Sequence, residues 1–344
     1  MFKPSFRITA QIASALMQIE ACRQAIDELP IDATVLRRLR ETAALSTTHF
    51  STQIEGNRLT LPEVRAAIQG ERMPGRERDE REVRNHFLAL KAMEKLSEEQ
   101  GRVSEEQVQR LHGLVMTGRD RPSPYRITQN VVRDSSTRRI VYLPPEAPDV
   151  PELMWSLVDW INTELSDGEL PAPIVAALAH YQFATIHPYL DGNGRTARLL
   201  ATSVLRRAGY GLKGIYSLDE HYARNLSSYY AALTVGSHNY YDGRAEGDVT
   251  PFVSYFCAGM ADAFTKVRAA ATRAEQRTAV DHSTLLRQLD PRQRRLVELF
   301  RKQGSATSAE MAAYLGMSSR TLVQLCREWI AGGFLEYQNA ARKT

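Results

Sequence analysis

Hydrophobic residues recur at intervals of three and four positions along most of the chain, and this period is typical of amphipathic helices. Capping residues support this interpretation, because Asp32, Ser104 and Thr250 each stand where a helical pattern begins. The charged residues 71–84 are predicted to form a solvated loop. The pattern therefore predicts a mainly α-helical protein. The expected helices cover residues 8–28, 32–54, 60–70, 87–96, 104–115, 150–165, 173–186, 194–208 and 250–266.

Residues 119–148 interrupt the helical pattern with several prolines. Two β-like runs, residues 128–132 and 140–143, are joined by the polar turn 133–139. Short apolar runs separated by turn residues are typical of paired strands, so this segment is predicted to form a β-hairpin.

Composition narrows the class of protein. The 344 residues are 43% hydrophobic and 24% charged, as in globular proteins, and this length suggests about two domains. The net charge of +4 permits contact with nucleic acid without indicating it. Cys22, Cys257 and Cys326 fit neither a disulfide framework nor a zinc site, so we expect a reducing, cytoplasmic compartment. We expect no membrane partner, because no apolar run approaches a membrane span and the N-terminal residues suit an amphipathic helix better than a signal peptide.

The C-terminal part has the order of elements of a winged helix-turn-helix domain. Three capped helices begin after Asp290, Thr307 and Ser318, and a strand is expected at residues 334–337. Arginines on the third helix would suit the DNA major groove, but there is no dense basic stripe. DNA binding and a protein-interaction or dimerisation role both remain open for this domain.

The stretch 187–198, with the sequence HPYLDGNGRTAR, has the features of a phosphate site. An apolar helix ends before Pro188, which disfavours helical backbone in the residue that precedes it. Glycines at 192 and 194 permit positive φ and close approach of a ligand, and the next helix begins at once. The free N–H groups and positive dipole end of that helix face the loop and favour an anion.

Side chains with distinct chemistry surround this predicted anion site. His187 titrates near neutral pH and can accept a proton. Asp191 offers hard oxygen ligands suited to Mg²⁺. Arg195 and Arg198 are three residues apart on one helix face and can bind phosphate oxygens.

Residues 187–198 resemble the signature of the Fic domain family, with Tyr189 in place of the usual Phe as the single departure. The resemblance covers roughly residues 40–260 and implies a Fic helical-bundle core in which the hairpin is a flap beside the active site. It also implies transfer of a nucleotide moiety, usually AMP from ATP with Mg²⁺, to a protein hydroxyl. The family pattern assigns His187 as the general base and Asp191 as the metal ligand. It assigns to the nucleotide Asp191, Gly192, Asn193, Gly194, Arg195, Thr196, Ala197, Arg198, Tyr229 and Tyr230.

The end of the second expected helix also resembles this family. Glu55 lies at a helix C-terminus, where the dipole disfavours a carboxylate. The pattern Ser51-x-x-x-Glu55-Gly56 resembles the inhibitory helix of Fic proteins, in which the glutamate pairs with the second arginine of the signature, here Arg198. The resemblance thus implies an enzyme that its own Glu55 inhibits.

The sequence therefore predicts a protein adenylyltransferase that acts on a Ser, Thr or Tyr hydroxyl of a target protein or of the chain itself. It leaves open removal of AMP, transfer of another phosphate-containing group, and a nucleotide-sensing transcriptional regulator that binds DNA. A homodimer is an expectation from the family alone. The expected segments are residues 1–100 (N-terminal helical region with the inhibitory helix), 101–265 (catalytic core), 266–284 (helical connector) and 285–344 (winged-helix domain).

Overall fold

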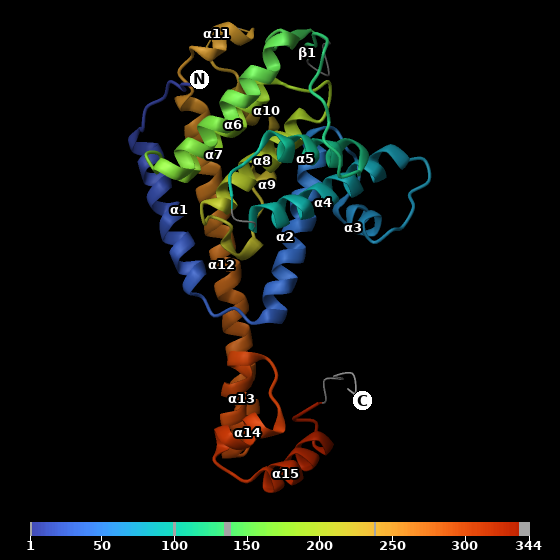
Figure 1. Ribbon diagram of the computed structural model, residues 1–344, viewed down its shortest axis with the longest axis vertical. Helices are drawn as coiled ribbons and strands as arrows, with labels where there is room; N and C mark the ends of the chain where they lie inside the picture. The colour runs from blue at the N-terminus through green and yellow to red at the C-terminus, as the bar shows by residue number, and fades with distance from the viewer. Residues whose placement is uncertain (1, 99–100, 134–138, 237–238, 337–344) are drawn as a thin grey trace. The chain divides into compact units, whose positions relative to one another are not determined.

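The computed structural model describes residues 2–98, 101–133, 139–236 and 239–336 (Figure 1). The chain forms two compact units, Met1–Ala274 and Glu275–Thr344. The mainly α-helical fold with a small β-hairpin is confirmed. The helices assigned in the first unit are α1 (Ala10–Glu28), α2 (Ala33–Ile54), α3 (Leu61–Ile68), α4 (Glu77–Glu98), α5 (Glu105–Thr117), α6 (Val150–Asp167), α7 (Ala172–Ile186), α8 (Asn193–Arg207), α9 (Asp219–Arg224), α10 (Leu226–Leu233), α11 (Tyr241–Ala245) and α12 (Thr250–Gln288), which continues into the second unit.

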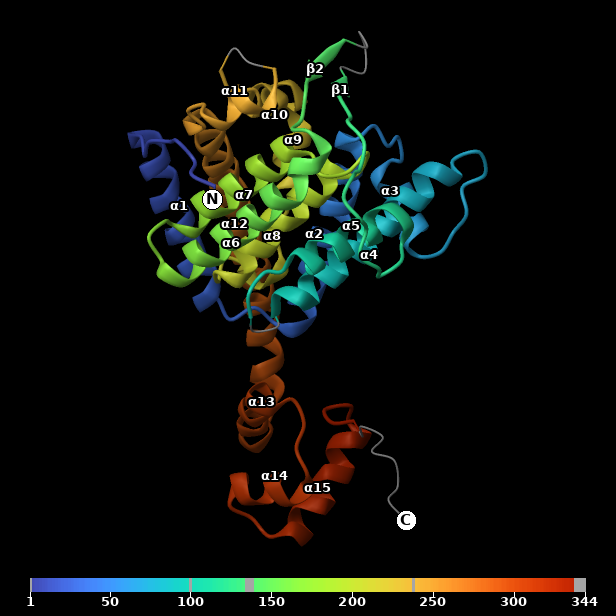
Figure 2. The ribbon, with the colours of Figure 1, turned by 45° about the horizontal axis from the view of Figure 1, so that its top comes forward.

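Helices α7 and α8 form the centre of the first unit. They pack against each other, with α6 against α7 and with α4 and α5 against α8 (Figures 1 and 2). Nearly every side chain of α7 is buried, including Ile174 and Phe183, because neighbours cover it on several sides. The loop 187–192 that joins α7 to α8 is therefore anchored at both ends in the core.

The predicted loop at residues 71–84 is wrong beyond residue 76, because α4 begins at Glu77. Its charged side chains are spaced to pair along a helix. Arg78 lies 3.0 Å from Glu82, and Arg84 lies 2.8 Å from Glu80. Oppositely charged residues four positions apart stabilise a helix. The high charge of this segment, considered without that spacing, suggests a loop.

Residues 219–233 form two helices, because the backbone breaks at Asn225. Asn225 has φ −141° and ψ 77°, and its side-chain oxygen accepts a hydrogen bond from the Ser228 N–H at 3.1 Å. Asparagine is among the residues preferred at this capping position, so it ends α9 and begins α10.

The β-hairpin is shorter than predicted and pairs β1 (Val132–Arg133) with β2 (Ile140–Tyr142) in antiparallel register (Figure 2). Residues 128–131 are not part of the strand. Side chains there bond to other loops instead, since Gln129 donates to the Pro144 carbonyl oxygen and Asn130 to the Tyr189 carbonyl oxygen.

The second unit contains α13 (Pro291–Gln303), α14 (Ser308–Leu315) and α15 (Ser319–Ala331). Its helices begin after the predicted caps and share a small core that includes Leu296, Leu322 and Trp329. The predicted strand is absent at residues 334–336, where Phe334 instead packs edge-on against Trp329, and Tyr337 lies outside the described residues. The wing of the predicted winged helix is thus not formed by the residues that the structure describes.

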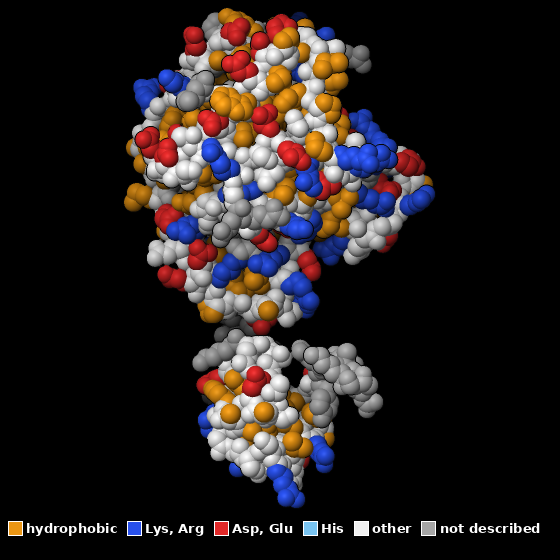
Figure 3. Space-filling model, in the orientation of Figure 1, with side chains coloured by type: hydrophobic (Ala, Val, Ile, Leu, Met, Phe, Trp, Pro, Cys, Tyr) orange, Lys and Arg blue, Asp and Glu red, His pale blue; other side chains and the backbone are white. Residues whose placement is uncertain are grey.

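Acidic and basic side chains are interspersed over the face of the first unit seen in Figure 3. Across the described residues, no helix combines the length and the apolar character that crossing a membrane requires.

Candidate active site

His187 ends α7 with a left-handed backbone, φ 52° and ψ 58°. A residue other than glycine adopts this conformation at some cost, so its surroundings must hold it. The backbone N–H of His187 donates to Phe183, and ring Nδ1 lies 3.2 Å from the Ala184 carbonyl oxygen. Because a carbonyl oxygen only accepts, Nδ1 carries the hydrogen and the Nε2 lone pair is left for a proton. Burial lowers the pKa of His187 below its usual value, so the ring is neutral at pH 7.

Two glycines let other groups approach the start of α8. Gly192 has φ 76°, and a Cβ there would lie 2.6 Å from Met116 Sδ. A Cβ on Gly194 would lie 2.3 Å from Glu55 Oε1 and 3.1 Å from Arg198 Nη1. The positive φ of Gly192 disfavours any other residue there, and a side chain at position 194 would require the Glu55 carboxylate to shift. The carboxylate of Glu55 thus lies directly over the first turn of α8.

Asn193 holds the loop rather than facing outward. Its side-chain oxygen accepts from the Tyr189 N–H at 3.0 Å, and its amide donates to the Tyr189 carbonyl oxygen at 2.8 Å. Asn193 is 3% exposed, so its side chain does not contact an incoming phosphate in this arrangement. Its part in the site is to fix the turn that presents the backbone.

Asp191 lies at the mouth of the loop with 60% of its side chain exposed. Its Oδ1 accepts from the Gly192 N–H at 2.6 Å and lies 3.5 Å from Arg195 Nη2. The Arg195 side chain is buried, so its guanidinium contacts the Asp191 carboxylate from the side of the protein interior. No cluster of three His, Cys, Asp or Glu side chains that could hold a metal occurs among the described residues.

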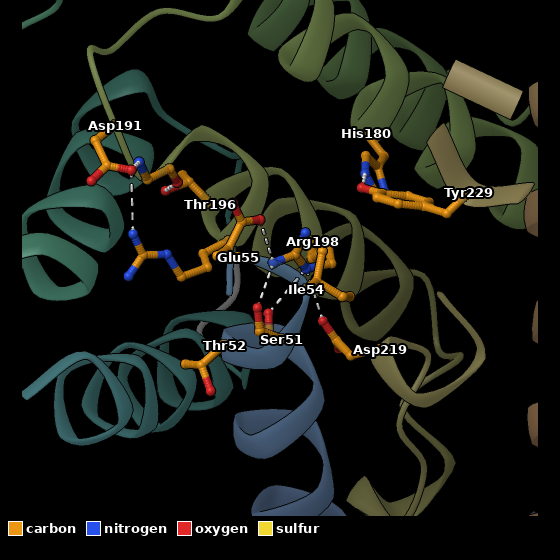
Figure 4. A network of polar contacts seen from close by, with 12 residues as sticks. Ser51, Thr52, Ile54, Glu55, His180, Asp191, Thr196, Arg198, Asp219 and Tyr229 are labelled. Carbon is orange, nitrogen blue, oxygen red and sulfur yellow. Dashed lines mark hydrogen bonds and ion pairs between the residues drawn. The ribbon is translucent and has the colours of Figure 1, made fainter. Parts of the chain in front are cut away.

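Arg198 is buried at the centre of a polar network (Figure 4). Its Nη2 donates to Glu55 Oε1 at 2.9 Å and to the Ser51 carbonyl oxygen at 2.8 Å. Its Nε donates to Ser51 Oγ at 3.0 Å and forms an ion pair with Asp219 Oδ1, also at 3.0 Å. The predicted contact between Glu55 and Arg198 is present. Nη1 has no hydrogen-bond acceptor in the described part of the chain.

The remaining predicted nucleotide-binding residues differ in exposure. Thr196 and Ala197 are fully buried in α8, and the Thr196 hydroxyl donates to the Gly192 carbonyl oxygen. Tyr229 is also buried, with its hydroxyl 2.9 Å from His180 Nε2. Tyr230 is 48% exposed. Of these four side chains, only that of Tyr230 is open to a ligand here, and contact with a nucleoside stays a prediction for it.

Two residues that the motif did not indicate hold the loop from outside. Arg126 is 5% exposed and donates to the His187 carbonyl oxygen at 3.0 Å. Its other nitrogens donate to Gln129, which precedes β1, and to the Pro145 carbonyl oxygen, which follows β2. His112 stacks on Tyr189 with ring centroids 3.5 Å apart, and its Nε2 lies 2.9 Å from the Asp191 carbonyl oxygen. His112 occurs at a buried position of a helical pattern, which gives a sequence signal, whereas nothing in the sequence distinguishes Arg126 from other loop arginines.

The comparisons with known proteins agree with this geometry. Residues 102–205 match the family model described as Fic/DOC family. Protein adenylyltransferase Fic of Drosophila willistoni is 31% identical over 242 residues, which is 70% of this chain and 45% of that protein. The protein of the same name from Nematostella vectensis is 31% identical over 247 residues, 70% of this chain and 52% of that protein. The chain thus spans about half the length of the curated relatives that it matches.

A solved structure matches nearly the whole chain. The crystal structure of a Fic family protein from Desulfovibrio desulfuricans G20 superposes with a TM-score of 0.60 at 26% identity, covering 96% of this chain and 92% of that one. The matched family segment contains α7, α8 and the loop between them. By sequence, by fold and by the geometry of that loop, this chain contains a Fic/DOC family domain.

Proposed function

We propose that this chain is a protein adenylyltransferase that transfers AMP from ATP to a Ser, Thr or Tyr hydroxyl of a protein, and that Glu55 inhibits it. The observation that carries the proposal is the juxtaposition of a neutral His187 with the glycine-lined N-terminus of α8. A proton acceptor beside an anion-binding helix end is what transfer of a phosphate-containing group requires. The names of the relatives support AMP as the transferred group.

In the proposed reaction, His187 Nε2 accepts the proton of the target hydroxyl. The hydroxyl oxygen bonds to the α-phosphorus of ATP, and the bond from that phosphorus to the bridging oxygen breaks, so pyrophosphate leaves. The N–H groups at the start of α8 and the Arg198 guanidinium bind the phosphates. Catalysis then depends on positioning and electrostatic stabilisation more than on further covalent chemistry.

Asp191 is suited to hold Mg²⁺ together with the nucleotide. Mg²⁺ is usually held by one or two carboxylates together with substrate phosphates, so a single exposed carboxylate fits such a site. Arg195 and the Gly192 N–H both contact Oδ1, which orients the carboxylate. When bound, the ion would offset the negative charge of the phosphates.

Glu55 would inhibit by competing with the phosphates for the same groups. Its carboxylate pairs with Arg198 Nη2 and lies over Gly194, in the space that an anion at the start of α8 would use. With 30% of its side chain exposed, Glu55 lies at the edge of the site and can move away.

The hairpin is the proposed docking element for the target. Ile140 and Val141 of β2 are 46% and 43% exposed, and the hairpin is continuous with the loop that Arg126 ties to His187. An extended target segment could pair with this edge as an additional strand and so bring its hydroxyl to Nε2.

The test uses the variant Glu55→Gly with ATP and Mg²⁺, followed by intact-mass measurement of the chain and of added candidate target proteins. We expect AMP labelling at least about tenfold faster than for the parent, since a released interaction of about 1.4 kcal/mol changes an equilibrium tenfold. The double variant Glu55→Gly/Arg198→Ala serves as the control and should not label. Absence of any AMP gain in Glu55→Gly would sink the proposal, and removal of AMP from a labelled protein without transfer would assign the reverse reaction.

A further inference from the structure

Arg198 has a second carboxylate partner, Asp219, that lies outside the matched family segment. Asp219 begins α9, and its Oδ1 lies 3.0 Å from Arg198 Nε. The same Nε donates a hydrogen bond to the Ser51 hydroxyl at 3.0 Å, so Asp219 and the α2 residue Ser51 both contact this nitrogen. Figure 4 shows Glu55 and Asp219 approaching the guanidinium from different elements.

The two carboxylates differ in their freedom to move. Asp219 has 5% of its side chain exposed, against 30% for Glu55. The helix of Asp219 packs on α2, and its neighbours Leu218 and Tyr222 are buried. Glu55 instead follows the last turn of α2. A change that displaces Glu55 from Arg198 therefore leaves Asp219 in place.

The contacts divide the guanidinium into two sides. On one side, Nε donates a hydrogen bond to the Ser51 hydroxyl and forms an ion pair with Asp219. Nη1 has no partner among the described residues and lies 3.1 Å from where a Cβ on Gly194 would be. Nη2 also faces Glu55 over that glycine. Asp219 thus leaves free the nitrogens that face the start of α8.

A buried cation needs a counter-charge in every state of the site. If Glu55 leaves Arg198 before phosphate arrives, Asp219 is the carboxylate that still contacts the guanidinium. Breaking a buried ion pair by removing its last partner is strongly destabilising, because the charge that remains is uncompensated. Burial also raises the pKa of Asp219, with Arg198 and Ser51 opposing that rise, so a carboxylate here is costly without its cation.

We propose that Asp219 is a positioning residue that keeps Arg198 paired and oriented toward the start of α8 after Glu55 has moved away. The proposal rests on the proposed function of the same site. Glu55 is then the removable partner of Arg198, and Asp219 is the permanent one. This division of roles explains how Glu55 can leave the site while the buried guanidinium of Arg198 keeps its position.

The first test is a double-mutant cycle on thermal unfolding of the full chain without nucleotide, comparing the parent, Glu55→Gly, Asp219→Asn and the double variant. Each single variant leaves Arg198 one carboxylate, and the double variant leaves none. We expect the double variant to lose at least about 5 °C more in unfolding midpoint than the two single losses add up to. Additive losses would overturn the proposal. If the double variant does not fold while both single variants do, Glu55→Gln replaces Glu55→Gly, because the amide keeps the hydrogen bond to Nη2 and removes the charge.

The second test measures AMP labelling at saturating ATP in the Glu55→Gly background. Adding Asp219→Asn should lower this rate at least about tenfold, as expected when a group that stabilises transferring charge is misplaced. Glu220→Gln is the matched control, since Glu220 is the next residue of α9 and pairs with Arg224 on the surface. The control should keep the rate, and an unchanged rate with Asp219→Asn would overturn the proposal.

The two tests separate this proposal from the proposed function. If Glu55→Gly gains no AMP, the adenylyltransferase assignment fails, while the unfolding cycle still decides whether Asp219 is the counter-charge of Arg198.

Discussion

The contacts of Arg126 predict that replacing it by lysine will damage both the stability of the first unit and the presentation of His187. The guanidinium donates to the His187 carbonyl oxygen at 3.0 Å, to Gln129 Oε1 at 2.8 Å and to the Pro145 carbonyl oxygen at 2.5 Å. These acceptors lie on different sides of a planar group. A lysine offers a single nitrogen and cannot reach all of them.

The magnitude follows from the bonds that are lost. Arg126→Lys should lose at least two hydrogen bonds from a charged donor, each worth about 1.5–3 kcal/mol, so the loss is about 3 kcal/mol or more. A domain of this size loses about 2–4 °C of unfolding midpoint per kcal/mol, which gives a fall of about 6 °C or more. The carbonyl of His187 would also be released from a backbone conformation that costs about 1–3 kcal/mol to hold. The ring should then shift, and displacements of about 1 Å can cost about a hundredfold in rate.

The assay compares thermal unfolding and AMP labelling for Glu55→Gly with and without Arg126→Lys. Arg119→Lys is the matched control, because Arg119 is exposed and lies at the start of the same segment. An unfolding midpoint within about 1 °C of the reference, together with an unchanged labelling rate, would refute the reasoning.

Two further predictions concern histidines. His187→Ala in the Glu55→Gly background should abolish labelling, because the proton acceptor is lost. ATP binding, measured by calorimetry, should persist because the start of α8 is kept. Retained labelling would exclude His187 as the base. Burial lowers the pKa of His86 and of His180 to about 3 and that of His112 to about 4. The unfolded chain binds these protons at about pH 6.5, whereas the folded chain does not. The free energy of unfolding should therefore fall by up to about 1.4 kcal/mol per pH unit for each histidine as the pH drops below that value. Unfolding midpoints measured at pH 7 and pH 5.5 test this expectation, and equal midpoints would contradict it.

The contiguous part of the site could be read from the sequence because its residues are neighbours in the chain. The order of proline, glycines and a new helix fixes a loop at a helix N-terminus, and the side chains 187–198 follow from that local geometry. The pair between Glu55 and Arg198 joins residues 143 positions apart, and only the family resemblance predicted it.

Other contacts could not be predicted, for physical reasons. Asp219 and Arg126 reach the site through the packing of whole elements, which no local pattern encodes. The inward orientation of Asn193 depends on a turn whose backbone groups it satisfies. The helical start at Glu77 was missed because charge alone suggests solvent, whereas the spacing of those charges decides whether they pair.

The left-handed backbone at His187 has a consequence for which residues mutation and selection would accept there. Glycine, and to a lesser degree asparagine, adopt φ near 52° more readily than histidine. Selection for folding alone would therefore favour those residues, and selection for proton transfer would favour histidine. In a library of variants at position 187, stability and labelling should rank the residues in opposite orders, so that stable glycine variants are inactive. Selection for proton transfer would then keep histidine at position 187, although the backbone conformation there favours glycine.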